Sequence, residues 1–124
     1  MSKHRLDEYL RHILQSIERI EDYTLHLSRE DFLTNMLVQD AVLRNIEIVG
    51  EASHKIEILF PEFAAAHPKL PLRAAYQMRN AVSHGYLEVD LAIVWNTVKA
   101  DLPDFGSMVK SLLAAISPKE RSPR

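Results

Sequence analysis

Cysteine is absent from the 124 residues of this chain, which excludes disulfide bonds and thiolate metal ligands and fits a reducing compartment. No apolar run approaches the roughly 18 residues that a membrane-spanning helix needs. The first five residues lead directly into an amphipathic pattern, without the apolar core of a signal peptide. We therefore expect a cytoplasmic protein that does not enter a membrane.

A strong charge of either sign is also missing, because the formal net charge is −2. This excludes an extended basic surface that grips nucleic acid through many phosphates, so any contact with RNA must be local. Charged residues make up 26% of the chain and hydrophobic residues 47%, which is ordinary for a globular domain. A chain of this length suits a single domain. We place it at residues 1–116, followed by a flexible C-terminal tail at residues 117–124.

Apolar residues recur at helical spacing along most of the chain, and strand patterns, repeats and low-complexity segments are missing. Ser28 and Asp31 predict a capping box at the start of the second helix, and Pro103 is expected to break or kink the last one. The expected helices cover residues 5–27, 29–59, 71–84 and 90–102, with residues 105–116 as a continuation or a fifth helix. The fold class is therefore all-α, an antiparallel bundle of four to five helices.

Three further expectations follow from the sequence: a second apolar face on one helix, a long loop and a helix cap. The helix at 29–59 carries apolar residues on more than one side, so we expect a second copy of the chain to bury the additional face. A long loop is expected at 61–71, with a short helical turn at 64–66. Asp90 is expected to cap the helix that follows the loop after residue 86.

The run from Arg79 to Tyr86 concentrates the chemistry of the chain. Arginine presents a permanent charge and a planar set of donors to phosphate oxygens, and histidine takes up or releases a proton near neutral pH. Arg79 and His84 together suit a reaction that holds a phosphodiester and deprotonates a hydroxyl, for which no metal ion is needed. The alternative is that Arg79 is a solvated helix residue and His84 a favourable cation at a helix C-terminus.

The spacing of this pair sets a geometric condition. Five residues on a regular helix correspond to about 140° of rotation, so Arg79 and His84 converge only if the helix ends near His84. Gly85 predicts such an end, because glycine is common just after a helix C-terminus.

Other charged residues have weaker claims on a site. Arg73 is expected either to be a solvent charge or to line the same cleft as Arg79. His12 and His26 are expected to be exposed and without a specific role.

Glu51 and His54 form an E-x-x-H pair, which is half of the motif of di-iron helix bundles. Such a site needs a second E-x-x-H and further glutamates, and the chain contains no second copy, although a symmetric dimer could supply one. We expect no metal and no cofactor. The simpler expectation is that Glu47 and Glu51 pair with Arg44 and Lys55 along one helix.

Arg79, His84 and Tyr86 match the R-x-x-x-x-H-x-Y signature of the HEPN superfamily, and the chain resembles the HepT-like toxins of that superfamily. The matching blocks occur in the right order and cover most of the chain: residues 40–52, 78–86, 89–91, 93–95 and 101–103.

This resemblance implies a helical, homodimeric ribonuclease toxin of a type VII toxin–antitoxin system, which cleaves RNA without a metal ion. Two chains would face each other across a cleft, with His84 as base on the ribose 2′-hydroxyl and as acid for the leaving oxygen. Arg79 would hold the scissile phosphate, and Asn80 would orient the phosphate or the imidazole. A nucleotidyltransferase antitoxin would silence the enzyme by attaching AMP to Tyr86, with ATP as substrate of that partner only.

Two other functional classes remain open. The chain could be a non-catalytic helical module that binds a nucleotidyltransferase, which tight partner binding without RNA turnover would favour. It could instead be a nucleotide-binding domain that uses Arg79 and His84 on a mononucleotide phosphate. Without the resemblance, Tyr86 is most simply a half-buried anchor with an exposed hydroxyl.

Overall fold

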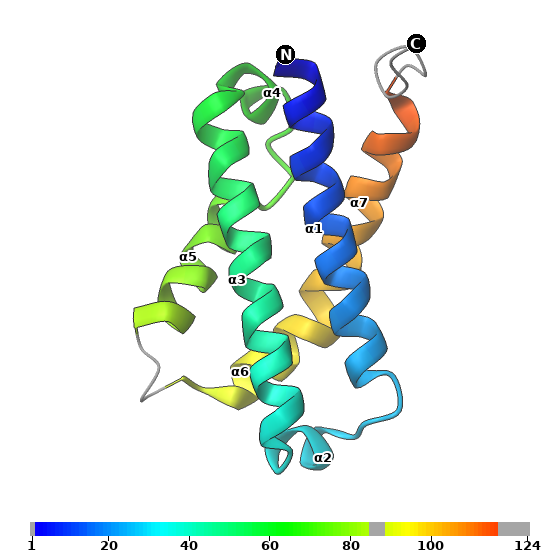
Figure 1. The fold of residues 1–124 in the computed structure, drawn as a ribbon, viewed down its shortest axis with the longest axis vertical. Coiled ribbons are helices and arrows are strands. Elements are labelled where there is room, and N and C mark those ends of the chain that lie inside the picture. The colour runs from blue at the N-terminus through cyan, green and yellow to red at the C-terminus, as the bar shows by residue number, and fades with distance from the viewer. Residues whose placement is uncertain (1, 85–88, 117–124) are drawn as a thin grey trace.

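Long helices lie side by side in the order α5, α3, α1, α7, and neighbours in this order run antiparallel (Figure 1). The structure is a computed structural model that describes residues 2–84 and 89–116, with side chains from Leu6 onward. The helices are α1 (Ser2–Thr24), α2 (Arg29–Leu33), α3 (Met36–Leu59), α4 (Pro61–Ala66), α5 (Leu72–His84), α6 (Leu91–Asn96) and α7 (Leu102–Ala115). The expected all-α bundle is confirmed. Within the described residues there is no strand, and no helix is both long and apolar enough to cross a membrane.

The helix expected at 29–59 is wrong in one respect, because the structure divides it into α2 and α3. Asn35 leaves the helical region with φ −115° and ψ 94°, and its side-chain oxygen accepts the backbone N–H of Val38 at 3.0 Å. Asn35 thereby caps α3, a role for which asparagine is among the best residues. The capping box of α2 is confirmed, since Ser28 Oγ accepts from the backbone of Asp31 and the Asp31 carboxylate accepts from the backbone of Ser28.

The long loop expected at 61–71 is also shorter than predicted. Pro61 stands in the first turn of α4, where its missing N–H is not needed for the helix. The connection without regular structure shrinks to residues 67–71, and α5 begins at Leu72.

The disturbance predicted at Pro103 takes the form of a wider helical turn. A π-helical segment (Thr97–Asp101) joins α6 to α7, and the N–H of Leu102 bonds to the carbonyl of Thr97. Because proline removes a donor and crowds the preceding turn, a π turn of this kind lets the backbone continue. Residues 105–116 therefore continue the preceding helix, and Asp90 caps α6 as expected, through bonds to two backbone N–H groups.

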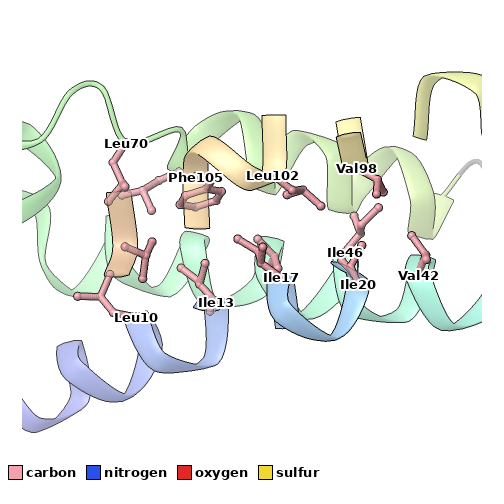
Figure 2. Packing of buried hydrophobic residues seen from close by; sticks show 14 of the residues in the cluster. Leu10, Ile13, Ile17, Ile20, Val42, Ile46, Leu70, Val98, Leu102 and Phe105 are labelled. Carbon is pink, nitrogen blue, oxygen red and sulfur yellow. The ribbon is translucent and has the colours of Figure 1, made fainter. Parts of the chain in front are cut away.

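The hydrophobic core lies where α1, α3 and α7 meet (Figure 2). Ile13, Ile17 and Ile20 point from α1 toward α3 and α7, and each is at most 1% exposed. Burying one such side chain stabilises the fold by roughly 1.5–3 kcal/mol. α3 packs along α1 on one side and along α5 on the other, while α7 packs against α1.

Candidate active site

The motif helix α5 packs closely against α3 at a glycine. A Cβ atom built on Gly50 would lie 2.2 Å from Cβ of Arg79 and 2.8 Å from the carbonyl oxygen of Ala75. Real Cβ atoms do not approach so closely, so only a residue without a side chain permits this crossing. Gly50 thus allows the stem of Arg79 to lie directly on the surface of α3.

The guanidinium of Arg79 is held by two neighbours. Its Nη2 lies 3.4 Å from Oε1 of Glu51 on α3, and its Nη1 donates to Oδ1 of Asn80 at 3.0 Å. The Arg79 side chain remains 30% exposed, so the cation is oriented by the protein and still reachable from solvent.

A second link between α3 and α5 lies one turn further along the motif. The hydroxyl of Ser83 donates to Oε2 of Glu47 at 2.9 Å, and the other oxygen of Glu47 lies 3.7 Å from Arg44. The expected pair of Arg44 and Glu47 is therefore confirmed. The expected partner of Glu51 was wrong, because its carboxylate contacts Arg79 of another helix rather than a residue of α3.

His84 is exposed and is the last described residue of α5, so the helix end predicted near this position stays a prediction. Its Nδ1 lies 3.1 Å from the backbone carbonyl oxygen of Asn80, one turn earlier. A neutral imidazole that carries its proton on Nδ1 would donate to this carbonyl and leave Nε2 free to accept a proton, as a general base must. The predicted roles of Gly85 and Tyr86 fall on residues outside the described part of the chain.

Arg79 and His84 open onto different hollows of the surface. Arg79 lines a hollow of about 450 Å³ between α1, α3 and α5. His84 lines another of about 480 Å³ between α5 and α6, together with Asn80 and Ile93. Asn80 connects the two, because its amide contacts Arg79 and its backbone carbonyl faces His84. Arg79 and His84 are thus each in contact with Asn80. The direct convergence of Arg79 with His84 stays a prediction.

Arg73 and His12, two residues with weaker claims on the site, are both exposed, as the sequence predicts. Arg73 is exposed and its Nε lies 3.5 Å from Oε2 of Glu57, and it does not line the hollow that holds Arg79. Its role in a cleft stays a prediction. His12 is exposed as expected, yet it lines the Arg79 hollow beside Tyr9. Sequence reasoning missed His12 because helical spacing does not tell which part of α1 adjoins the crossing of α3 and α5.

The E-x-x-H pair is engaged in other contacts. The ring of His54 stacks on Tyr76, with centroids 3.8 Å apart and planes 5° from parallel, and Glu51 faces Arg79. In the described residues, no three histidine or acidic side chains are grouped so that they could hold a metal ion.

Comparison with known proteins agrees with the motif. The model of the family described as Ribonuclease HepT-like matches residues 13–112. A protein of Thermococcus cleftensis named "Probable ribonuclease HepT" is 39% identical over 105 residues, which cover 85% of this chain and 93% of that protein. A "Putative RNase" of Caldanaerobacter subterraneus is 34% identical over 105 residues, covering 85% and 91%.

A further relative contains the same region as part of a longer chain. The "Gamma-glutamylcyclotransferase and putative RNase" of Methanocaldococcus jannaschii is 44% identical over 95 residues, which cover 77% of this chain and 41% of that protein. No solved structure matches the chain. On the family match and the extent of these similarities, this chain belongs to the HepT-like ribonuclease family.

Proposed function

We propose that this protein is a metal-independent endoribonuclease and the toxin of a type VII toxin–antitoxin pair. The observation that carries the proposal is the arrangement at Asn80, which contacts the guanidinium of Arg79 with its amide and the imidazole of His84 with its backbone carbonyl. A phosphate-binding cation and an oriented base are thereby tied to one residue of a helix end. The membership in a ribonuclease family supports RNA as the substrate.

The proposed reaction uses the RNA's own 2′-hydroxyl. His84 accepts the hydroxyl proton, the 2′-oxygen bonds to the adjacent phosphorus, and the bond from phosphorus to the 5′-oxygen breaks. An imidazolium donates a proton to that leaving oxygen, so the products are a 2′,3′-cyclic phosphate and a 5′-hydroxyl. Arg79 stabilises the negative charge that develops on the phosphate oxygens.

A homodimer would complete this site. Because Arg79 and His84 of one chain open onto different sides of α5, two chains that face each other through α5 would supply both groups to one cleft. Exposed apolar residues are consistent with a surface that a second copy covers, among them Ile93 at 55%, Met36 at 74% and Leu37 at 80% exposure.

We propose that a nucleotidyltransferase antitoxin silences the enzyme at Tyr86. The tyrosine hydroxyl would attack the α-phosphate of ATP, form a phosphodiester with AMP and release pyrophosphate. Tyr86 lies two residues after His84 in the sequence, so the added negative phosphate and its bulk would keep an RNA phosphate away from the site. Both proteins would act in the cytoplasm.

The test is cleavage of a defined RNA in the presence of EDTA, with analysis of the new ends. His84→Ala should lower the rate by about 10²–10⁴, while His26→Ala, which removes another exposed histidine, should leave it unchanged. A 2′-deoxy nucleotide at the scissile position should abolish cleavage. Equal rates for wild type and His84→Ala, or no cleavage by a folded dimer free of AMP, would contradict the proposal and favour a non-catalytic binding module.

A further inference from the structure

The hollow that holds Arg79 contains more functional groups than the motif itself requires. Its walls come from three helices, with Tyr9 and His12 on α1, Lys55 on α3 and Arg79 on α5. At about 450 Å³ it falls within the usual range of small-ligand pockets. A space of this size suits one nucleotide.

The charges of this hollow differ from those of the whole chain. Two of its cations form ion pairs, since Arg44 lies 3.7 Å from Glu47 and Arg79 lies 3.4 Å from Glu51. Lys55 is exposed and forms no ion pair with any described residue. The hollow therefore has a surplus of positive charge, although the chain as a whole carries a net charge of −2.

Ring surfaces line the α1 side of the hollow. The rings of Tyr9 and His12 meet edge to face, with centroids 6.5 Å apart and planes at 84°. Single-stranded nucleic acids are bound in general by the combination of cations that follow the backbone and rings on which bases stack. Both components occur here next to the arginine of the motif.

We propose that this hollow is a subsite for the RNA nucleotide next to the scissile phosphate. Lys55 binds the phosphate of that nucleotide, and the imidazole of His12 offers its face to the base, with Tyr9 supporting the ring. This inference rests on the proposed function, since Arg79 is taken to hold the scissile phosphate. It adds that α1 and α3 guide the strand on the Arg79 side of α5.

The experiment measures binding of a short RNA that carries a 2′-deoxy nucleotide at the scissile position, so that binding is observed without cleavage. Lys55→Ala should weaken binding and reduce the slope of log affinity against log salt by about 0.7, the value for one phosphate contact with a single strand. Lys55→Arg should retain the slope, because the positive charge is kept. Lys110→Ala removes an exposed lysine of α7 and should change neither quantity.

His12→Ala should weaken binding about tenfold without changing the salt slope, because stacking is lost and no charge contact is removed. An unchanged slope in Lys55→Ala would overturn the subsite. AMP that binds as tightly as the oligonucleotide, with the same dependence on Lys55, would also overturn it and indicate a mononucleotide site.

The two proposals can fail separately in this design. If the wild type cleaves RNA and Lys55→Ala binds RNA like Lys110→Ala, the subsite is refuted while the nuclease proposal still stands. Binding that depends on Lys55 and His12, without cleavage of an all-ribose RNA, would support RNA binding in this hollow and refute the proposed chemistry. Because Lys55 and His12 are both exposed, thermal unfolding is expected to be unchanged in these variants.

Discussion

Arg79 is oriented by two side chains that affect an anionic ligand in opposite ways. Asn80 is neutral and shares the guanidinium without repelling a phosphate, whereas Glu51 carries a negative charge that competes with the phosphate. Glu51 is 51% exposed, and exposed ion pairs of this kind contribute at most about 1 kcal/mol to stability. The contact with Glu51 therefore matters for the position of the cation more than for the stability of the fold.

Replacing Glu51 by glutamine separates these two effects. We expect Glu51→Gln to bind a non-cleavable RNA several-fold more tightly, because no carboxylate competes for Arg79. Cleavage of bound RNA should be slower, because the guanidinium is less firmly oriented. The free energy of unfolding should change by less than about 1 kcal/mol. Fluorescence anisotropy and single-turnover cleavage measure the two functional quantities.

Glu57→Gln is the matched control for this change. It also removes a carboxylate of α3 from an arginine of α5, because Glu57 pairs with Arg73 away from the Arg79 hollow. We expect no change in RNA binding or cleavage. Weaker RNA binding by Glu51→Gln would show that Glu51 does not compete with the phosphate.

At the scale of helices, the crossing of α3 and α5 determines where the motif lies. Gly50 allows the close approach, and the contacts of Glu47 with Ser83 and of Glu51 with Arg79 lie on either side of it. The three contacts come from neighbouring turns of α3, so they hold a continuous stretch of α5. The block of residues 40–52, which carries part of the family resemblance, is thus the surface on which the motif rests.

Gly50→Ala tests this crossing. Alanine has a higher helix propensity than glycine by about 1 kcal/mol, yet its Cβ would lie 2.2 Å from Cβ of Arg79. We expect a net loss of about 1–3 kcal/mol in the free energy of unfolding, measured by urea denaturation, and less cleavage per folded molecule. In Gly106→Ala the nearest atom is Cγ2 of the Ile17 side chain at 3.2 Å, which can shift, so stability should change less and cleavage should persist. Wild-type stability and activity in Gly50→Ala would refute this role of Gly50.

The break between α2 and α3 offers a second test at this scale. Asn35→Ala removes the side-chain oxygen that accepts the N–H of Val38, and we expect the free energy of unfolding to fall by about 1 kcal/mol. Asn35→Asp keeps an acceptor and should be close to wild type. Thermal unfolding of wild type, Asn35→Ala and Asn35→Asp measures these differences in stability. If Asn35→Ala were as stable as wild type, Asn35 would not be what starts α3.

At the scale of the whole molecule, the positions of Arg79 and His84 determine whether one chain or two chains form the active site. A single chain shows the two side chains in different hollows, joined through Asn80. In the proposed dimer, the single cleft receives these groups from both chains.

Mixing two inactive variants tests whether the site is shared. Arg79→Ala homodimers lack every motif arginine and His84→Ala homodimers lack every motif histidine, so both should be strongly impaired. A mixed dimer regains one Arg79 and one His84 in one cleft, and we expect its RNA cleavage to exceed that of both variants. Native mass spectrometry confirms that the chains have exchanged. Activity no higher than the average of the two variants, despite exchange, would contradict a shared site.

Features that depend on neighbouring residues could be predicted from the sequence alone. The capping box of Ser28 and Asp31 and the cap at Asp90 both appear in the structure. They follow from hydrogen bonds and steric preferences within one helical turn, and residues close in sequence determine them. The all-α fold could be predicted from the helical spacing of apolar residues, and the motif of Arg79 and His84 is recognised by its resemblance to a known signature.

Features that depend on how helices face each other were decided only by the tertiary structure. The partner of Glu51, the need for glycine at position 50 and the place of His12 in the Arg79 hollow each involve a residue on another helix. They depend on the rotation of each helix about its axis and on the crossing of α3 with α5. Apolar spacing reports which face of a helix is buried, but not which residues of the next helix that face meets.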